Sequence, residues 1–322
     1  MKILGFVEGA TSSKGGLGLV GVPMIMSNLA ARGHNVILVV GGPPSPGREN
    51  YVVRNVEDAL TRKEGAGTFG ILTTGAWTTW AFNPLVLWKF RKIAREADCI
   101  SLHSLYSFPV LAGYLLACAY RKPYAVWPHG LFAPVQRQIS RKIKWLYGVI
   151  IGRRILDRAS VIFYSAEGER QEAEPLGLLP PSVVVPHGIK AAEFDTLPAR
   201  GKFRDRYFSG HSGPLVLFLA RLNEKKGLDL LIEAMARVVA RLPDTRLAIV
   251  GPPDPPSFRK RVLDWISRQD IGSKVTVTGA LSDSEKLEAL ADADVFVLPS
   301  QAENFGFSIF EAMASRIPGG CK

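Results

Sequence analysis

"LVLFLARLNEKKGLDLLIEAMARVVARL" (residues 215–242) is the stretch that decides the fold. Residues 215–220 are apolar and predict a buried strand, and residues 228–242 predict a helix with one apolar face. That face consists of Leu228, Leu231, Met235, Val238 and Leu242. Further strands, separated by helices, are expected at 246–251, 274–279 and 295–300. This alternation predicts a mostly parallel sheet covered on both faces.

The first part of the chain shows the same alternation from its start. A strand at 3–8, the glycine loop "SKGGLG", a helix that stops at Gly33 and a strand at 35–42 form a βαβ start. Further strands are expected at 68–73, 99–103, 124–127, 160–164 and 183–185. The stretch 186–213 is polar and carries several Gly and Pro residues, which favours a domain boundary there. The sequence therefore predicts two α/β domains in tandem, 1–190 and 191–322, with ligand in the cleft at the carboxyl ends of the strands.

The bulk composition is that of a folded globular protein. Hydrophobic residues make up 47% of the 322 residues, and the formal net charge is +11. A basic balance favours an anionic partner, which is a nucleic acid, an anionic lipid or a phosphorylated small molecule. The three cysteines, Cys99, Cys118 and Cys321, fit neither a disulfide framework nor a zinc site, so we expect a reduced, cytoplasmic location. We expect no signal peptide, since few apolar residues precede a glutamate in 1–10, and the apolar runs 110–120 and 143–152 are too short to span a bilayer.

Cationic side chains follow the first strand of the second domain. Arg221, Lys225 and Lys226 come just before the N-terminus of a predicted helix. Cations and a helix dipole converge there, which is typical of a diphosphate site. The alternative is a solvated basic turn.

Two carboxylates flank a glycine-bearing turn near the end of the sequence. In "FVLPSQAENFGFSIFEAMAS" (296–315), Glu303 lies in the turn, Gly306 allows close approach of the backbone to a ligand, and Glu311 lies in the following helix. A carboxylate accepts hydrogen bonds from vicinal hydroxyls, so the pair is suited to holding two polyols on either side of a phosphate. The alternative is two ordinary surface glutamates, one of them near a helix N-terminus.

A histidine of the first domain is a further candidate. His129, in "VWPHGLFAP", follows a buried strand and precedes a glycine turn, so its ring can reach the cleft. It is suited to orienting a sugar hydroxyl or stabilising charge, and the alternative is a histidine satisfied by the local backbone. His103 also ends a strand.

These stretches together resemble the retaining glycosyltransferases of family 4, which have the GT-B fold of two Rossmann-like domains. "ARLNEKKG" is similar to the arginine–lysine phosphate motif of that family, and "ENFGFSIFEAMA" is similar to its E-x7-E motif. "SKGGLG" and "VVPHGI" stand where the family has similar segments, although His187 occupies a position where the family usually has asparagine. The resemblance covers nearly the whole chain. It implies transfer of a sugar, with retention of configuration, from a nucleotide-diphosphate donor to a polysaccharide or glycolipid acceptor, without a metal ion or other cofactor.

The resemblance also implies a role for each matching residue. Arg221 and Lys226 would hold the donor diphosphate, Glu303 the donor sugar and Glu311 the ribose, with His129 near the reacting carbon. Asn304, Phe305 and Gly306 would present backbone to the sugar and phosphate. Gly15 and Gly16 would form the first-domain loop that closes on the donor phosphate and admits the acceptor.

A basic amphipathic segment runs through residues 135–160, where apolar residues interleave with seven cations at helical spacing. Such a segment suits an anionic membrane surface near a lipid-linked acceptor, which would make the protein peripheral at the inner face of the membrane. The alternative is an ordinary helix with a cationic solvent side. Nucleic acid is a less favoured partner, since no basic–aromatic platform is present.

The sequence ends at "EAMASRIPGGCK", soon after the E-x7-E motif. In the family, another buried strand and further helices follow, so we expect a C-terminal truncation, an incomplete second domain and an unpaired edge strand. Two alternative functions stay open: an inactive nucleotide-sugar-binding protein, and a nucleotide-sugar epimerase or hydrolase on the same fold.

Overall fold

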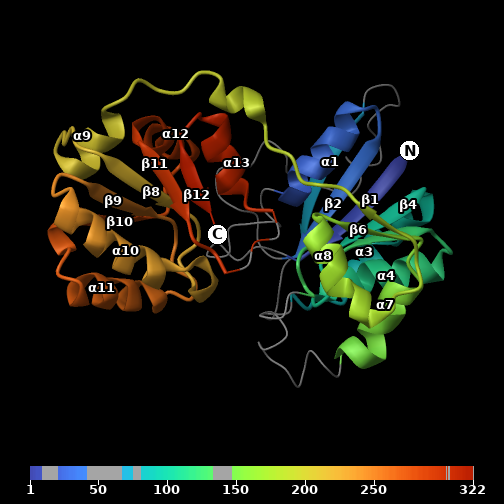
Figure 1. Ribbon diagram of the computed structural model, residues 1–322. Coiled ribbons are helices and arrows are strands. Elements are labelled where there is room, and N and C mark those ends of the chain that lie inside the picture. Colours follow the sequence, from blue (N-terminus) through green and yellow to red (C-terminus); the bar gives the residue numbers. More distant parts are fainter. Residues whose placement is uncertain are drawn as a thin grey trace. The chain divides into compact units, whose positions relative to one another are not determined.

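The computed structural model describes residues 1–8, 21–41, 67–74, 81–132, 147–301, 303 and 305–321. The chain divides into two compact units, Met1–His187 and Gly188–Lys322. Each unit has a parallel sheet of its own with helices packed on it (Figure 1). The α/β fold class with two mostly parallel sheets, predicted from the alternation of strands and helices, is confirmed.

The Met1–His187 unit contains a seven-stranded sheet in the order β3-β2-β1-β4-β5-β6-β7, and every pair in it is parallel. Its strands are β1 (Lys2–Val7), β2 (Asn35–Gly41), β3 (Phe69–Thr74), β4 (Cys99–His103), β5 (Tyr124–Trp127), β6 (Val161–Tyr164) and β7 (Ser182–Val184). Its helices are α1 (Gly21–Ala31), α3 (Leu85–Glu96), α4 (Phe108–Ala119), the π-helical turn η2 (Gly148–Gly152), α7 (Arg153–Asp157), α8 (Glu167–Ala173) and the 3-10 turn η3 (Glu174–Leu176).

Alternate residues of β1 face two different cores, as the period of a strand requires. Leu4 and Phe6 are fully buried in the larger core, which also contains residues of α3 and α4. Val7 lies in a smaller core with Val22 and Met26 of α1. The central strands are therefore apolar on both faces because helices cover both faces.

The Gly188–Lys322 unit contains a five-stranded parallel sheet in the order β10-β9-β8-β11-β12. Its strands are β8 (Leu215–Leu219), β9 (Arg246–Val250), β10 (Val275–Gly279), β11 (Val295–Leu298) and β12 (Gly319–Cys321). Its helices are α9 (Lys202–Phe208), α10 (Leu228–Arg241), α11 (Phe258–Arg268), α12 (Asp283–Asp292) and α13 (Phe307–Ala314), with 3-10 turns η4 (Ala191–Phe194), η5 (Glu224–Lys226) and η6 (Gly272–Lys274). Helix α10 contacts α11 and helix α9 contacts α12, and the two pairs lie on opposite faces of the sheet (Figure 1).

Two sequence-based expectations about this unit are wrong. Strand β11 is paired on both sides, because β12 adds to it in parallel with Phe296 opposite Gly319. The segment has no apolar run to mark it as a strand, but the Phe296 amide donates to the Pro318 carbonyl at 2.9 Å and extends the ladder. Leu242, expected on the apolar face of α10, is 59% exposed because it lies at the C-cap, beyond the last helical turn.

The strand order of each sheet reverses direction once. In the first sheet the reversal lies between β1 and β4, and in the second it lies between β8 and β11. Loops that follow two such strands leave the sheet in opposite directions, which opens a crevice outside their carboxyl ends. Candidate binding residues are therefore expected after β8 and β11 in one unit, and after β1 and β4 in the other.

A buried ionic network ties α9 to the sheet of the second unit. Arg204 is 8% exposed and donates to the carbonyls of His211 at 2.9 Å and Gly213 at 2.6 Å, and to Asp294 Oδ2 at 2.6 Å. The fully buried Asp292 accepts from the Arg204 amide at 2.9 Å. All of these polar groups are satisfied by one another, so removing the guanidinium leaves several buried acceptors unpaired.

We expect Arg204→Ala to lower the free energy of unfolding by about 3 kcal/mol, because the carbonyls of His211, Gly213 and Asp292 lose the buried guanidinium that donates to them. Urea denaturation followed by circular dichroism measures the change. The matched control is Arg237→Ala, which removes an exposed cation paired with Glu233 four residues earlier and is expected to change stability by less than about 0.5 kcal/mol. Equal effects of the two variants would show that the network does not stabilise the unit.

Candidate functional site

The predicted residues of the second unit lie in the loops that follow β8 and β11, the two strands at the reversal of the sheet. Lys226 ends the 3-10 turn η5 after β8, and Gly227 begins α10 with a positive φ of 63°. A Cβ on Gly227 would lie 2.1 Å from the Pro299 carbonyl oxygen, so only glycine lets this turn pack against the end of β11. The Gln301 amide donates to the Lys225 carbonyl at 2.8 Å and joins the two loops directly.

Lys226 and Glu303 form an ion pair, between Lys226 Nζ and Glu303 Oε1. Ser300 Oγ donates to the same carboxylate oxygen at 2.7 Å. The two charged side chains are 15% and 23% exposed, so the contact is well shielded from water. The predicted diphosphate cation and the predicted sugar carboxylate are thus brought into direct contact.

Arg221 has an acidic partner from a different loop. Its Nη1 donates to Asp254 Oδ2 at 2.7 Å, and the arginine side chain stays 38% exposed. The Asp254 amide donates to the Leu222 carbonyl at 2.9 Å, which holds the turn after β9 beside the loop after β8. Asp254 is therefore placed to orient the guanidinium while leaving part of it accessible.

The E-x7-E segment continues into helix α13. Gly306 has a positive φ of 73° at the N-cap, and a Cβ there would lie 2.8 Å from Ile309 Cδ1. Phe305 stacks on Phe310 with ring centroids 4.4 Å apart. Glu311 Oε1 accepts from Lys286 Nζ at 2.8 Å, and Lys286 belongs to α12. Lys286 thereby joins the site from a helix that the motifs do not include.

Three cation–carboxylate pairs therefore lie among the described residues of this site: Arg221 with Asp254, Lys226 with Glu303, and Lys286 with Glu311. Sequence reasoning missed Asp254, Ser300 and Lys286, because they match no motif. Asp254 and Lys286 also come from a different loop and a different helix. The only available signal was their position after β9, after β11 and between β10 and β11, where the sheet brings segments together.

The first unit places His129 directly after β5, with a positive φ of 55°. Its Nε2 lies 3.1 Å from Nδ1 of His103, and Nε2 of His103 lies 3.0 Å from Ser101 Oγ. His103 ends β4 and is fully buried. A hydrogen-bonded chain Ser101–His103–His129 thus runs across two neighbouring strands, and each contact carries one proton.

A third histidine and a tryptophan extend this cluster. The rings of His129 and His187 are stacked with centroids 5.4 Å apart, and Trp127 stacks on His103 at 5.8 Å. Burial, together with the neighbouring His187, lowers the pKa of His103 to about 3. Burial lowers the pKa of His187 to about 4, and burial with both neighbouring histidines holds the pKa of His129 well below its ordinary value. The three imidazoles are therefore neutral at pH 7.

Three of the predicted site residues, Gly15, Gly16 and Asn304, lie outside the described residues. The structure thus places His129, Arg221, Lys226, Glu303, Phe305, Gly306 and Glu311. Their assigned roles stay predictions.

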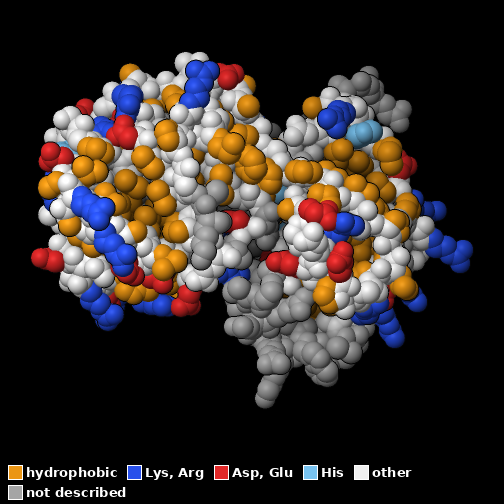
Figure 2. Space-filling model, viewed as in Figure 1, with side chains coloured by type: hydrophobic (Ala, Val, Ile, Leu, Met, Phe, Trp, Pro, Cys, Tyr) orange, Lys and Arg blue, Asp and Glu red, His pale blue; other side chains and the backbone are white. Residues whose placement is uncertain are grey.

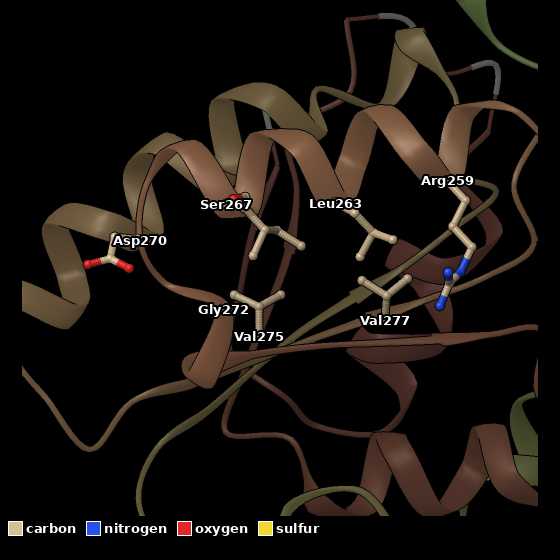
Figure 3. A pocket seen from close by; sticks show the side chains of 8 residues that line it. Arg259, Leu263, Ser267, Asp270, Gly272, Val275 and Val277 are labelled. Atoms are coloured by element: carbon tan, nitrogen blue, oxygen red, sulfur yellow. The ribbon is translucent and has the colours of Figure 1, made fainter.

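A hollow of about 380 Å³ lies between α11 and the edge strand β10 (Figure 3). Leu263, Val275 and Val277 face one another across it, and Arg259 and Asp270 lie toward its two ends (Figure 3). None of the predicted site residues lines it. The charged residues predicted for the second unit therefore lie apart from this hollow, at the ends of β8 and β11.

Solved structures share the fold of the chain. HepE of Anabaena, in a complex with UDP-glucose, aligns with a TM-score of 0.75 at 19% identity, covering 100% of this chain and 80% of HepE. The sucrose-phosphate synthase of Thermosynechococcus elongatus aligns with a TM-score of 0.69 at 20% identity, covering 99% of this chain and 80% of the synthase. At these identities the likeness shows the GT-B fold.

Curated relatives match the chain over different lengths. The phosphatidyl-myo-inositol mannosyltransferase of Mycolicibacterium smegmatis is 27% identical over 294 residues, which are 88% of this chain and 66% of that protein. The mannosylfructose-phosphate synthase of Agrobacterium fabrum is 34% identical over 124 residues, 37% of this chain and 27% of the synthase. The chain spans about two thirds of the length of the mannosyltransferase that it matches.

Two family models match in succession. The model described as "Glycosyl transferase 4-like domain" matches residues 19–188, over half of the chain, and the model described as "Glycosyl transferases group 1" matches residues 200–319. The order and extent of the two matches agree with the resemblance seen in the motifs. The chain belongs to this family of GT-B glycosyltransferases.

Proposed function

We propose that the chain transfers a sugar from a nucleotide-diphosphate donor to a polysaccharide or glycolipid acceptor, with retention of configuration. The observation that carries the proposal is the convergence of Arg221, Lys226 and Glu303 at the carboxyl ends of β8 and β11. The names of the relatives support it, since they include a mannosyltransferase acting on phosphatidyl-myo-inositol, and HepE is known in a complex with UDP-glucose.

The second unit supplies the electrostatic part of the proposed reaction. The bond that breaks joins the anomeric carbon of the sugar to the diphosphate, and the bond that forms joins that carbon to an acceptor oxygen. Arg221 and Lys226 would bind the departing diphosphate beside the N-terminus of the 14-residue helix α10, whose dipole favours negative charge. These groups supply the positive charge at the leaving group, so the proposed reaction needs no metal ion and no resident cofactor.

The carboxylates would hold the two polyols of the donor. Glu303 would leave Lys226 and accept hydrogen bonds from sugar hydroxyls, while Lys226 turned to the diphosphate. Glu311 would accept from the ribose, with Lys286 fixing one of its oxygens at 2.8 Å. Asn304, Phe305 and Gly306, which directly follow Glu303 in the sequence, would present backbone to the sugar and phosphate.

The first unit would contribute His129 near the reacting carbon, with Gly15 and Gly16 closing on the donor phosphate. Burial holds the pKa of His129 well below its ordinary value, so the ring would act as a neutral hydrogen-bonding group. It would orient a sugar hydroxyl through a hydrogen bond and would carry no positive charge itself.

An anionic membrane surface is proposed as a further partner. Residues 135–146 of the basic segment 135–160 lie outside the described residues. Arg153 of the same segment is engaged by Asp157 and by the Leu176 carbonyl. No helix within the described residues has both the length and the apolarity needed to cross a bilayer.

Helix α3 offers the described surface that best supports this membrane contact. Leu85 is 48% exposed and Trp88 is 63% exposed on its first turns. The solvent face also carries the exposed cations Lys89, Arg91, Lys92 and Arg95. Lys and Arg side chains gather along one margin of the Met1–His187 unit in Figure 2. Apolar side chains beside a cluster of cations are typical of surfaces that bind anionic lipid.

The test of the proposed activity is a donor screen followed by a transfer assay. Thermal-shift measurements against UDP-, GDP- and ADP-sugars identify the donor, and transfer of labelled sugar to lipid and polysaccharide acceptors measures turnover. Glu303→Ala is expected to lower the transfer rate by about 10²–10³-fold, because an interaction with the reacting sugar is lost. Affinity for the free nucleoside diphosphate should not fall, because the Lys226 ammonium is released from its carboxylate.

The matched control is Glu233→Ala, an exposed glutamate on α10 that is paired only with Arg237 among the described contacts and should leave both quantities unchanged. If Glu303→Ala weakened nucleoside diphosphate binding as much as it slowed transfer, the role given to Glu303 would be wrong. Donor binding without any transfer would indicate an inactive nucleotide-sugar-binding protein, and an altered donor without acceptor would indicate an epimerase or hydrolase.

For the membrane contact, we expect Trp88→Ala to weaken binding to phosphatidylglycerol vesicles by at least about ten-fold, since burying a large apolar side chain contributes about 2 kcal/mol. Vesicle co-sedimentation at low and high salt measures it. Leu179→Ala is the control, because Leu179 is 78% exposed and lies outside α3. Equal binding of the two variants would contradict a role for α3.

The depressed pKa values of the histidine cluster predict that acid destabilises the first unit. Below pH 6.5, the ordinary pKa of histidine, His187 and His103 are protonated in the unfolded chain. In the folded unit, His187 stays neutral down to its pKa of about 4 and His103 down to its pKa of about 3. The contribution of the two histidines to the free energy of unfolding is fully present above pH 6.5. It falls by about 1.4 kcal/mol per pH unit for each histidine as the pH falls toward 4. Urea unfolding between pH 6 and pH 5 measures the slope. It should be smaller in His187→Asn than in the unaltered chain, and identical slopes would refute the prediction.

A further inference from the structure

We propose that Glu169 is a positioning residue for the reaction, whose buried carboxylate holds the His129–Gly130 turn and thereby the His129 ring in place. The inference rests on the proposed function, because it assumes that His129 acts on the substrate. Glu169 is named by none of the sequence motifs and lies in the first turn of α8, on a different element from His129.

The carboxylate of Glu169 receives three hydrogen bonds from two segments. Oε1 accepts from the Gly130 amide. Oε2 accepts from the Ser165 amide and from Ser165 Oγ, both at 2.7 Å. The residue is only 4% exposed, so these bonds form in a region from which water is largely excluded. Charge-assisted bonds of this kind are among the strongest that a side chain makes to the backbone.

The turn that Glu169 holds is one that the chain does not adopt easily. His129 and Gly130 both have positive φ, 55° and 76°. The left-handed region is unfavourable for a histidine because its Cβ crowds the following carbonyl oxygen. The Gly130 amide is buried and points to Glu169, so without the carboxylate this donor would lose its partner. The carboxylate therefore compensates a strained backbone at the residue where the proposed chemistry occurs.

The ring of His129 is fixed from the opposite side by His103. The 3.1 Å contact between His129 Nε2 and His103 Nδ1 depends on where the His129 backbone lies. Ser101 Oγ in turn fixes His103 at 3.0 Å. The hydrogen bonding of the His129 ring therefore depends on the whole series Ser101–His103–His129. Glu169 holds the backbone of the turn, and His103 holds the His129 ring. A shift of the turn would therefore break the hydrogen bond between His129 and His103 as well as the one between Gly130 and Glu169.

A merely structural role for Glu169 has different consequences. A residue that only stabilises α8 and β6 would change the unfolding midpoint and leave turnover per folded molecule unaltered. A positioning residue changes kcat and the state of the His129 ring in molecules that remain folded. The two roles are therefore separable by measurements at a temperature well below unfolding.

The test is Glu169→Gln in the full chain. The side-chain NH2 of glutamine cannot accept a hydrogen bond from an N–H, and only its carbonyl oxygen can. Either the Gly130 amide or the Ser165 amide therefore loses its acceptor, while the shape of the side chain is kept. We expect kcat to fall by about 10²-fold, as for a displacement of about 1 Å at a reacting group. The KM for the donor should stay within about three-fold, because most of the proposed donor contacts belong to the second unit. The ring ¹⁵N signals of His129 and His103 should shift. Glu167→Gln, an exposed position in the same turn of α8, is the control and should change none of these.

The outcomes separate this inference from the proposed function. Unchanged kcat in Glu169→Gln alongside an inactive His129→Ala would overturn the positioning role and leave the function standing. If the unaltered chain transfers no sugar, the proposed function fails, and the ¹⁵N signals alone decide whether Glu169 positions the ring. If Glu169→Gln does not fold, hydrogen exchange of the unaltered chain is the deciding measurement. A slowly exchanging Gly130 amide supports the proposal that Glu169 holds the turn, and a rapidly exchanging one overturns it.

Discussion

The parallel pairing of β8 with β11 is the constraint on which the candidate site depends. Both strands run in the same direction, so the loops that carry Lys226 and Glu303 leave the sheet at the same edge. The reversal of strand order at this pair sends the flanking helices to different sides and leaves the loop ends accessible. Gly227 then allows the two loops to touch, since any side chain there would strike the Pro299 carbonyl.

In the first unit the neighbouring parallel strands β4 and β5 also end at one edge of their sheet, although the strand order reverses between β1 and β4. His103 is the last residue of β4, and His129 follows two residues after β5. Here the groups that converge are neutral and aromatic, whereas those of the second unit are ionic. Burial explains the difference, because imidazoles that are removed from water lose their proton while paired charges keep theirs. The two units therefore bring different kinds of polar group to the proposed reaction.

Much of the fold could be predicted because buried strands and amphipathic helices leave strong periodic signals. The strands expected from 3–8 to 295–300 are all present within a residue or two of their predicted bounds. Strand β12 escaped because its glycines carry no apolar pattern, and extended backbone alone makes the ladder. The motifs named Arg221, Lys226, Glu303 and Glu311 as candidates. Asp254, Lys286 and Glu169 could not be found that way. Their contacts join residues that are 25 or more positions apart in the sequence, and these residues meet only because the sheets bring distant segments together.

The ion pair between Lys226 and Glu303 competes with any anion that binds Lys226. An anion that binds Lys226 must first separate it from a shielded carboxylate, and the affinity is reduced by the fraction of molecules in which the pair is closed. On the proposed function, a nucleotide sugar would offer the displaced Glu303 new hydroxyl partners, whereas inorganic pyrophosphate offers none. The ion pair would then favour ligands that bear both a phosphate and a polyol over anions without hydroxyl groups. The ratio of the inhibition constants of inorganic pyrophosphate and of a nucleotide sugar measures this selectivity.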